Sequence, residues 1–133
     1  MSRTVNVSLL PDRRLRVSLD QHTLILDRPK SKGGQGNDPS PTDLFLMSIA
    51  ACSTFYAQGF AEQRNISSEG MSLSMECEYD PEANRYFELE ATLTLPPDFP
   101  EKYENAVSKA MEGCTVKKHI TNPPVFANLV KRS

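Results

Sequence analysis

Apolar and polar residues alternate along the first part of the chain, and this alternation is typical of half-buried β-strands. Three such runs precede residue 28, and short polar turns separate them. Their apolar or β-forming positions are Val5, Val7 and Leu9, then Leu15, Val17 and Leu19, then the stretch 23–27. The sequence therefore predicts a three-stranded meander.

Residues 28–40 break this alternation. The segment is rich in glycine, proline and lysine, and its glycine spacing matches neither a P-loop nor a GxGxxG motif. Its composition favours a mobile connection or lid over a phosphate-binding loop.

A long helix is predicted from Pro41 to about Arg64. Ser40 is a suitable N-cap, Pro41 suits the first helical position, and Asp43 places a carboxylate in the first turn, roughly as in a capping box. Asn65 is a plausible residue to end the helix. These signals define the longest element of the chain.

Small residues make the middle of this helix slim, so we expect other elements to pack closely on more than one side. Cys52 lies in this region, in a crowded and mostly apolar setting. Its helical face also carries Phe45, Ser48, Phe55, Tyr56 and Gly59.

The second half of the chain predicts a hairpin, a helix and a last strand. Residues 71–79 and 87–95 alternate cleanly around a short turn, which indicates two antiparallel strands with one buried face. A helix with a capping-box-like start at Asp98 and Glu101 places Cys114 on its apolar stripe. Pro123-Pro124 stops helical structure, and residues 125–130 suit an edge strand.

The predicted order is βββ-α-ββ-α-β, an α+β fold in a single domain over residues 1–133. The chain is 38% hydrophobic and 24% charged, which suits a globular protein. A net charge of −2 favours neither nucleic acid nor a membrane surface as partner. We find no apolar run of membrane-spanning length and no signal peptide, and expect a cytoplasmic protein.

The three cysteines are the candidates for chemistry. An odd count without close pairing argues against a secreted disulfide framework. Cys52 and Cys114 lie on apolar helical stripes, where a nearby cation would be needed to ionise a thiol. Arg14, Arg16 and Arg28 are candidate cations. A peroxide would convert such a thiolate to a sulfenic acid, which a second cysteine can resolve. Simple packing of both cysteines in the core is the alternative.

Other polar and sulfur-containing residues give weaker signals. Cys77 falls on the buried face of a predicted strand, where packing explains it. His22 lies in a turn, and His119 follows Cys114 without any CxxC or HxxxH pattern, so a zinc site is not indicated. We expect neither a metal nor a cofactor.

Two stretches resemble the OsmC/Ohr family. The first combines LeuAspArgProLysSerLysGlyGly with AspProSerProThrAspLeuPheLeuMetSerIleAlaAlaCys, which ends at Cys52. The second is AlaMetGluGlyCysThrVal, which contains Cys114. The resemblance covers most of the chain, including the strand order and the long helix after a glycine-rich loop.

This resemblance implies an intertwined α+β homodimer with active sites at the subunit interface. It also implies a thiol-dependent peroxidase that reduces organic hydroperoxides in oxidative-stress defence. Cys52 would then be the peroxidatic cysteine and Cys114 the resolving cysteine. A thiol reductant, either a small dithiol or a lipoylated or thioredoxin-like protein, would reopen their disulfide.

The chain departs from the family pattern beside the first cysteine. Family peroxidases carry a glutamate directly after the helix-opening proline, where it orients an arginine, whereas this chain has Thr42. Asp43 follows, but at about 100° per residue it lies roughly opposite Cys52 unless the helix is kinked. The family arginine matches Arg13 or Arg14 best, and we take Arg14 as the candidate.

Other functions stay open. Thr115 follows Cys114, where proline is common in the family. Thr42 in place of the family glutamate favours a second possibility, a non-catalytic dimer that binds a small hydrophobic ligand at the subunit interface. A purely structural role for both cysteines predicts no disulfide between them after mild oxidation.

Overall fold

The computed structural model describes residues 1–133, and its contacts divide them into two compact units. The first unit comprises Met1–Met47 and the second Ser48–Ser133. Strands and helices are segregated along the chain, with antiparallel strands throughout, so the α+β class predicted from the sequence is confirmed.

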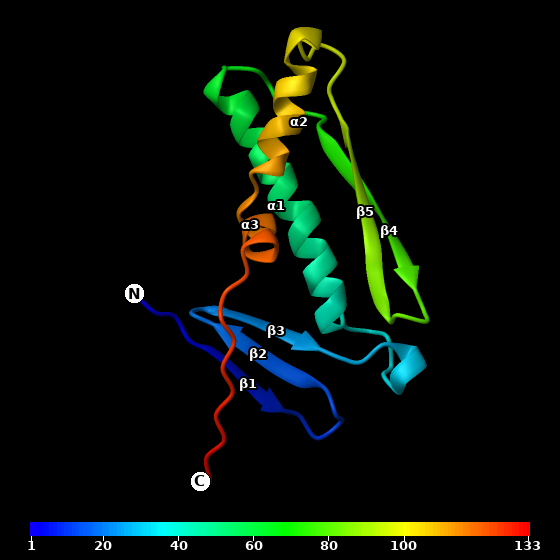
Figure 1. The fold of residues 1–133 in the computed structure, drawn as a ribbon, viewed down its shortest axis with the longest axis vertical. Helices are drawn as coiled ribbons and strands as arrows, with labels where there is room; N and C mark the ends of the chain where they lie inside the picture. Colours follow the sequence, from blue (N-terminus) through cyan, green and yellow to red (C-terminus); the bar gives the residue numbers. More distant parts are fainter. The chain divides into compact units, whose positions relative to one another are not determined.

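The first unit contains a three-stranded antiparallel sheet in the order β1-β2-β3 (Figure 1). Its strands are β1 (Val5–Leu9), β2 (Leu15–Leu19) and β3 (His22–Leu26). Arg13 and Asp20 adopt left-handed backbone conformations in the two connecting turns, with φ of 71° and 52°. The predicted meander is confirmed, and β3 begins and ends one residue earlier than expected.

The segment after β3 folds around a buried carboxylate. Asp27 accepts hydrogen bonds from the backbone N–H groups of Arg28, at 2.7 Å, and Gln35, at 2.9 Å. Its own N–H donates to the Pro39 carbonyl oxygen. A short 3₁₀ turn, η1 (Lys30–Lys32), lies within this segment. The composition favoured a mobile connection, whereas the structure shows a loop closed by specific hydrogen bonds.

Helix α1 (Pro41–Gln63) begins with the predicted capping box. The Asp43 N–H donates to Ser40 Oγ at 3.1 Å, and the Ser40 N–H donates to Asp43 Oδ2 at 2.9 Å. At the other end, Asn65 adopts a left-handed conformation with φ of 56°, as expected of a residue that ends a helix. The predicted bounds are therefore confirmed to within one residue.

The second unit contains an antiparallel hairpin of β4 (Ser72–Asp80) and β5 (Arg85–Thr94). The register shifts between Glu78 and Tyr79. Tyr79 and Phe87, which the alternation placed on the buried face, lie near this irregularity and are exposed. The buried face is confirmed only for the half of the hairpin farther from its turn.

The helix after the hairpin starts differently from the prediction. A 3₁₀ turn, η2 (Glu101–Tyr103), precedes α2 (Glu104–Glu112), and no side chain caps either element. The capping box expected from Asp98 and Glu101 is therefore wrong. Pro100 occupies the N-cap position of η2, and its side chain has no oxygen that could accept a backbone N–H.

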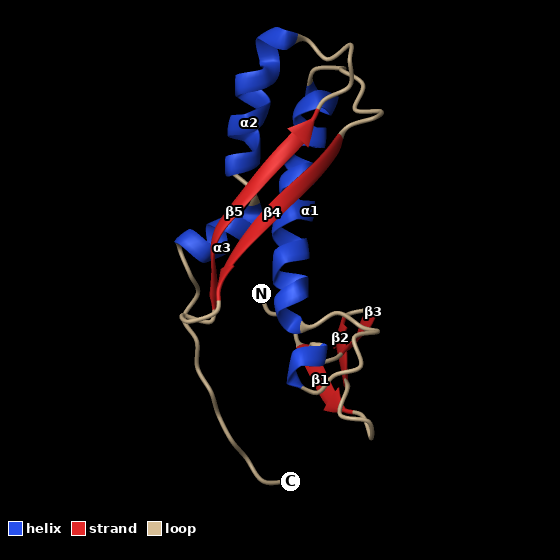
Figure 2. Cartoon of the chain, turned by 90° about the vertical axis from the view of Figure 1, so that its right-hand side faces the viewer, coloured by secondary structure: helices blue, strands red, loops and turns tan.

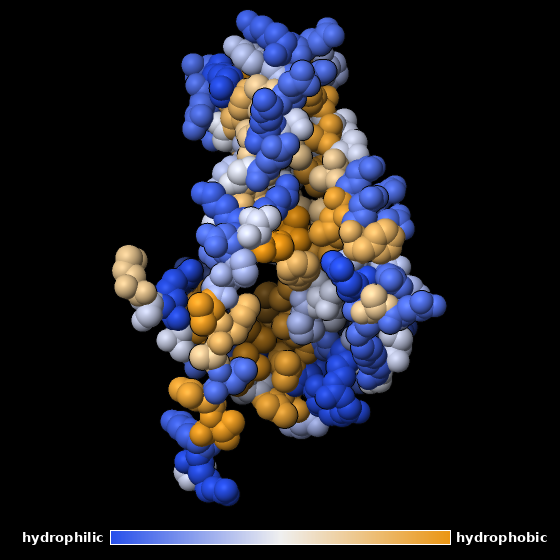
Figure 3. Space-filling view, viewed as in Figure 1, coloured by the Kyte–Doolittle hydropathy of each residue, from blue (hydrophilic) through white to orange (hydrophobic).

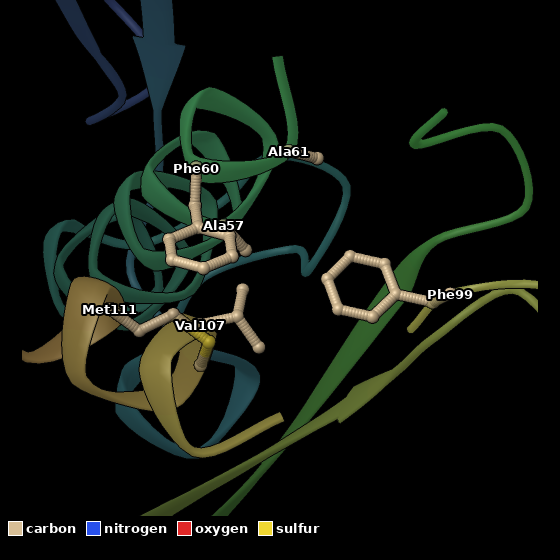
Figure 4. Packing of buried hydrophobic residues seen from close by; sticks show 6 residues of the cluster. All are labelled: Ala57, Phe60, Ala61, Phe99, Val107 and Met111. Atoms are coloured by element: carbon tan, nitrogen blue, oxygen red, sulfur yellow. The ribbon is translucent and has the colours of Figure 1, made fainter. Parts of the chain in front are cut away.

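The core of the second unit lies between α1, α2 and the hairpin, which run alongside one another in both views (Figures 1 and 2). Figure 4 shows Ala57 and Phe60 of α1 directed towards Val107 and Met111 of α2, with Phe99 beside them. The partly buried residues packed on this cluster include Met71, Leu73, Tyr103, Ala91, Leu93 and Leu95. The small residues of α1 permit this close packing, as the sequence predicted.

The end of the chain departs from the prediction in two ways. A third helix, α3 (Thr115–Thr121), follows Cys114 directly and was not expected. Residues 125–130 form no strand, and their apolar side chains are exposed at the C-terminal end (Figure 3). A strand needs a neighbouring strand to satisfy its backbone groups, and no strand pairs with this segment.

Helix α1 also corrects an expectation about membranes. It is as long and as apolar as a membrane-spanning helix, with a mean hydropathy of 1.4 over an 18-residue window. Core helices of globular proteins pass the same test, and α1 contributes Ala57, Phe60 and Ala61 to the core described above.

Candidate functional site

The structure brings Cys52 and Cys114 together. Cys52 is half-buried on α1, whereas Cys114 is fully buried and directly precedes α3. Both thiols are free, and the Cys52 thiol is near enough to the Cys114 sulfur to lower the pKa of Cys114. Two cysteines that are far apart in the sequence therefore meet in one site.

The sulfur of Cys114 acts as the N-cap of α3. It accepts a hydrogen bond from the backbone N–H of Lys117 at 3.4 Å. Burial raises the pKa of this thiol, but the Lys117 N–H, the Cys52 thiol and the Lys117 ammonium group outweigh burial and lower the pKa below its ordinary value. The surroundings of Cys114 thus favour its thiolate.

Ser53 adds a polar group beside the two sulfurs. It is 1% exposed, and its hydroxyl makes no hydrogen bond of ordinary geometry. As a nearby donor it contributes slightly to the lowered pKa of Cys114. A buried hydroxyl without a partner is costly, and a thiolate on Cys114 would give it an acceptor. The sequence indicated Ser53 only as a small residue of a slim helix.

A second polar contact joins the same two helices. The Tyr56 hydroxyl and Thr115 Oγ1 are 2.6 Å apart. Tyr56 lies one turn after Cys52 on α1, and Thr115 immediately follows Cys114. Sequence reasoning placed Tyr56 on the correct helical face and identified Thr115 as a departure from the family, but had no signal that the two make contact.

The predicted cation Arg14 lies in the first unit and already has two acidic partners. Its Nε is 2.6 Å from Asp12 Oδ2, and its Nη1 is 3.0 Å from Asp38 Oδ2. Hydrogen bonds to Asp38 and Asp12 raise the pKa of Arg14, and the hydrogen bond from Arg14 lowers the pKa of Asp12. A role for Arg14 beside Cys52 stays a prediction.

Asp43 serves the start of α1. Its carboxylate accepts the Ser40 N–H at 2.9 Å, and α1 is a continuous α-helix through this region. The capping role of Asp43 is therefore shown, and its role as a substitute for the family glutamate stays a prediction.

The remaining candidates lie apart from any cluster of ligands. Cys77 is half-buried on β4, where its thiol donates weakly to the Met75 carbonyl at 3.7 Å. His119 Nδ1 lies 2.7 Å from the Thr115 carbonyl oxygen. No three histidine, cysteine or acidic side chains are grouped so that they could hold a metal ion.

The sequence matches the OsmC-like protein family over residues 34–127, a segment that includes both Cys52 and Cys114. The chain belongs to this family. A comparison with curated proteins found no match.

Several solved structures share this OsmC-like fold. An osmotic stress induced and detoxification response protein from Psychrobacter arcticus 273-4 is 24% identical, with a TM-score of 0.78 over 92% of this chain and 90% of that one. An OsmC-like protein from Mycoplasma pneumoniae is 16% identical, with a TM-score of 0.70 over 91% and 88%. An organic hydroperoxide resistance protein OsmC from Legionella pneumophila is 24% identical, with a TM-score of 0.60 over 90% and 89%. At these identities the likeness establishes the shared fold.

Proposed function

We propose that this OsmC-like protein is a thiol-dependent peroxidase that reduces organic hydroperoxides. The observation that carries the proposal is the pairing of two free thiols, Cys52 and Cys114, in one largely buried site. Similar solved structures named as organic hydroperoxide resistance proteins support the class of substrate. The chain would serve in oxidative-stress defence, in the cytoplasm, where thiols remain reduced.

The proposed reaction has three steps. The Cys52 thiolate attacks a peroxide oxygen, the O–O bond breaks, and the alkoxide leaves and takes up a proton as an alcohol. The Cys114 thiolate then attacks the sulfur of the Cys52 sulfenic acid and expels hydroxide, which forms a disulfide. A dithiol reductant restores both thiols and is itself oxidised to a disulfide.

The surroundings of Cys114 favour the second of these steps. Its sulfur accepts the Lys117 N–H, and its lowered pKa raises the fraction of thiolate at neutral pH. The first step needs a cation beside Cys52, and Arg14 is the proposed source. Cys52 is also the more exposed of the two thiols, as the sulfur that meets substrate should be.

We further propose that the protein functions as a homodimer. Large apolar side chains are exposed on α1, on the first sheet and near the C-terminus, and such patches mark interaction surfaces. They include Phe45, Met47, Phe55, Val7, Leu9, Phe126 and Leu129. A second copy of the chain would cover these groups and supply a partner for the unpaired C-terminal segment.

Replacing Cys52 tests the enzymatic proposal most simply. We expect Cys52→Ser to abolish dithiol-dependent consumption of cumene hydroperoxide, because serine provides no redox-active sulfur. Cys77→Ser is the matched control and should retain activity, since Cys77 lies on β4 and outside the site. Unchanged turnover by the Cys52→Ser variant would remove the peroxidase claim.

A second candidate function is the binding of a small hydrophobic ligand without catalysis. The observation in its favour is a mainly apolar cavity of about 370 Å³ beside α1, lined by Ala51, Thr54, Phe55, Gln58, Ser68 and Met71. Thr42, in place of the family glutamate, points the same way. Slow alkylation of Cys52 by iodoacetamide at neutral pH would favour binding, and fast alkylation would favour the peroxidase.

A further inference from the structure

Helices α1 and α3 are joined at two neighbouring points. At the first, the Cys52 thiol approaches Cys114, and at the second, the Tyr56 hydroxyl meets Thr115 Oγ1 at 2.6 Å. Tyr56 lies one turn after Cys52, and residues at this spacing share a helical face. Thr115 is covalently next to Cys114, so the contact with Tyr56 restrains the backbone beside the Cys114 sulfur.

The α3 helix has little else to hold it in place. It spans only Thr115–Thr121, and none of its residues is buried. The buried Cys114 side chain caps α3. The other side-chain hydrogen bonds of α3 go to residues nearby in the sequence, such as the one from Lys117 Nζ to the Met111 carbonyl oxygen at 3.3 Å. The Tyr56–Thr115 contact is therefore a hydrogen bond that fixes the start of α3 directly to α1.

We propose that Tyr56 and Thr115 are a positioning pair that holds Cys114 ready to form a disulfide with Cys52. The inference rests on the proposed function, in which these two cysteines form the redox couple. Neither residue touches substrate or takes part in bond making. The hydroxyl pair acts by restricting the distance and direction from which the Cys114 sulfur approaches Cys52.

The expected size of the effect follows from the kind of contact. A hydrogen bond between neutral groups has a modest net value, about two- to tenfold in an equilibrium constant. This value is an upper bound here, because the bond already forms beside the free thiols and only its strengthening in the disulfide form shifts the equilibrium. Part of the Tyr56–Thr115 contact is accessible to water, since Thr115 is exposed. We therefore expect a measurable weakening of disulfide formation and not its abolition.

The quantity to measure is the equilibrium constant for the exchange of the Cys52–Cys114 disulfide with dithiothreitol. In this exchange the protein disulfide gains two electrons and two protons, and the dithiol loses them to become a cyclic disulfide. The variants Tyr56→Phe and Thr115→Val each remove one hydroxyl with little change of shape. Thr115→Ser retains the hydroxyl and serves as the conservative rescue variant.

We expect Tyr56→Phe and Thr115→Val to favour the reduced thiols by up to about tenfold. The double variant should lie close to either single one, because both substitutions break the same bond. Thr115→Ser should stay near the wild-type value, because it keeps the hydroxyl. Tyr79→Phe should also stay near that value. It removes a tyrosine hydroxyl of the second unit that donates to Asn84 and lies outside the site. Circular dichroism confirms that each variant is folded.

The outcomes separate this proposal from the one on which it depends. Wild-type constants for Tyr56→Phe and Thr115→Val, with the disulfide still formed, would overturn the positioning role alone. Additive effects in the double variant, or a Thr115→Ser constant shifted towards the reduced thiols as far as that of Thr115→Val, would overturn it as well. If the wild-type protein forms no Cys52–Cys114 disulfide at any dithiothreitol ratio, the proposed redox couple is wrong, and the positioning role falls with it.

Discussion

The two units of the chain are stabilised by different interactions. In Met1–Met47 the one buried apolar side chain is that of Leu26, and the defined contacts are ion pairs and hydrogen bonds such as those of Arg14 and Asp27. In Ser48–Ser133 a continuous apolar cluster joins α1, α2 and the hairpin. The buried cysteine of the candidate site, Cys114, belongs to the second kind of environment.

This difference bears on the candidate site. The buried Cys114 sulfur is held within the packed second unit as the cap of α3, and Cys52 beside it is half-buried. A unit with many exposed apolar strand residues and surface ion pairs instead depends on further contacts for its burial. The comparison therefore predicts that substitutions in the second unit affect stability most.

The largest expected effect comes from Phe60. Its ring is 7% exposed, packs edge-to-face on Tyr103 at 5.8 Å and lies under the Arg64 guanidinium at 3.7 Å. Phe60→Ala would leave a cavity in the cluster and should lower the free energy of unfolding by about 3–5 kcal/mol. Urea denaturation followed by circular dichroism measures this change.

Phe87→Ala is the matched control for Phe60. Phe87 is 60% exposed on β5 of the same unit, so its truncation should change the midpoint little. Equal losses for the two variants would contradict the location of the core.

A smaller effect is expected at Gly34 in the first unit. A Cβ atom added there would lie 1.7 Å from the Arg28 carbonyl oxygen, so the loop around Asp27 would have to move. Gly34→Ala should cost about 1–3 kcal/mol, as other overpacked sites do. Gly113→Ala is the control, because its Cβ would make an ordinary contact at 3.6 Å. A wild-type midpoint for Gly34→Ala would show that this loop is not closed as described.

The smallest effect is expected from the ion pairs of Arg14. The hydrogen bond from Arg14 lowers the pKa of Asp12 in the folded protein. The ion pair therefore stabilises the fold fully at pH values above the ordinary pKa of Asp12. This stabilisation is lost as the pH falls through the lowered pKa. Arg14→Ala should remove this part of the pH dependence and have less effect at high salt. A stability profile between neutral and acidic pH, with Arg3→Ala as a second surface pair for comparison, tests the assignment.

Local signals in the sequence were enough to predict the regular elements. Alternation located the five strands, and Ser40, Pro41 and Asp43 located the start of α1, because each acts on its immediate neighbours. The helix α3 was missed because its cap is the Cys114 sulfur, an unusual acceptor that no helix-start rule includes. Residues 125–130 have the composition of a strand but no partner strand within the chain.

The candidate site was predictable only in part. The helical stripes and the family resemblance indicated Cys52 and Cys114, and the structure brings them together. The Tyr56–Thr115 contact and the position of Lys117 at Cys114 depend on how α3 folds back on α1, which no local pattern encodes. Ionisation of Cys52, which the sequence led us to expect, stays a prediction, and the structure adds surroundings that lower the pKa of the Cys114 thiol.

The most direct test of the redox couple is a disulfide map after a single oxidation. The reduced protein is treated with one equivalent of tert-butyl hydroperoxide, blocked with iodoacetamide, digested and analysed by mass spectrometry. We predict a peptide pair linked through Cys52 and Cys114, with Cys77 alkylated. Recovery of Cys52 and Cys114 as separate alkylated or over-oxidised peptides, or a disulfide through Cys77, would contradict the account.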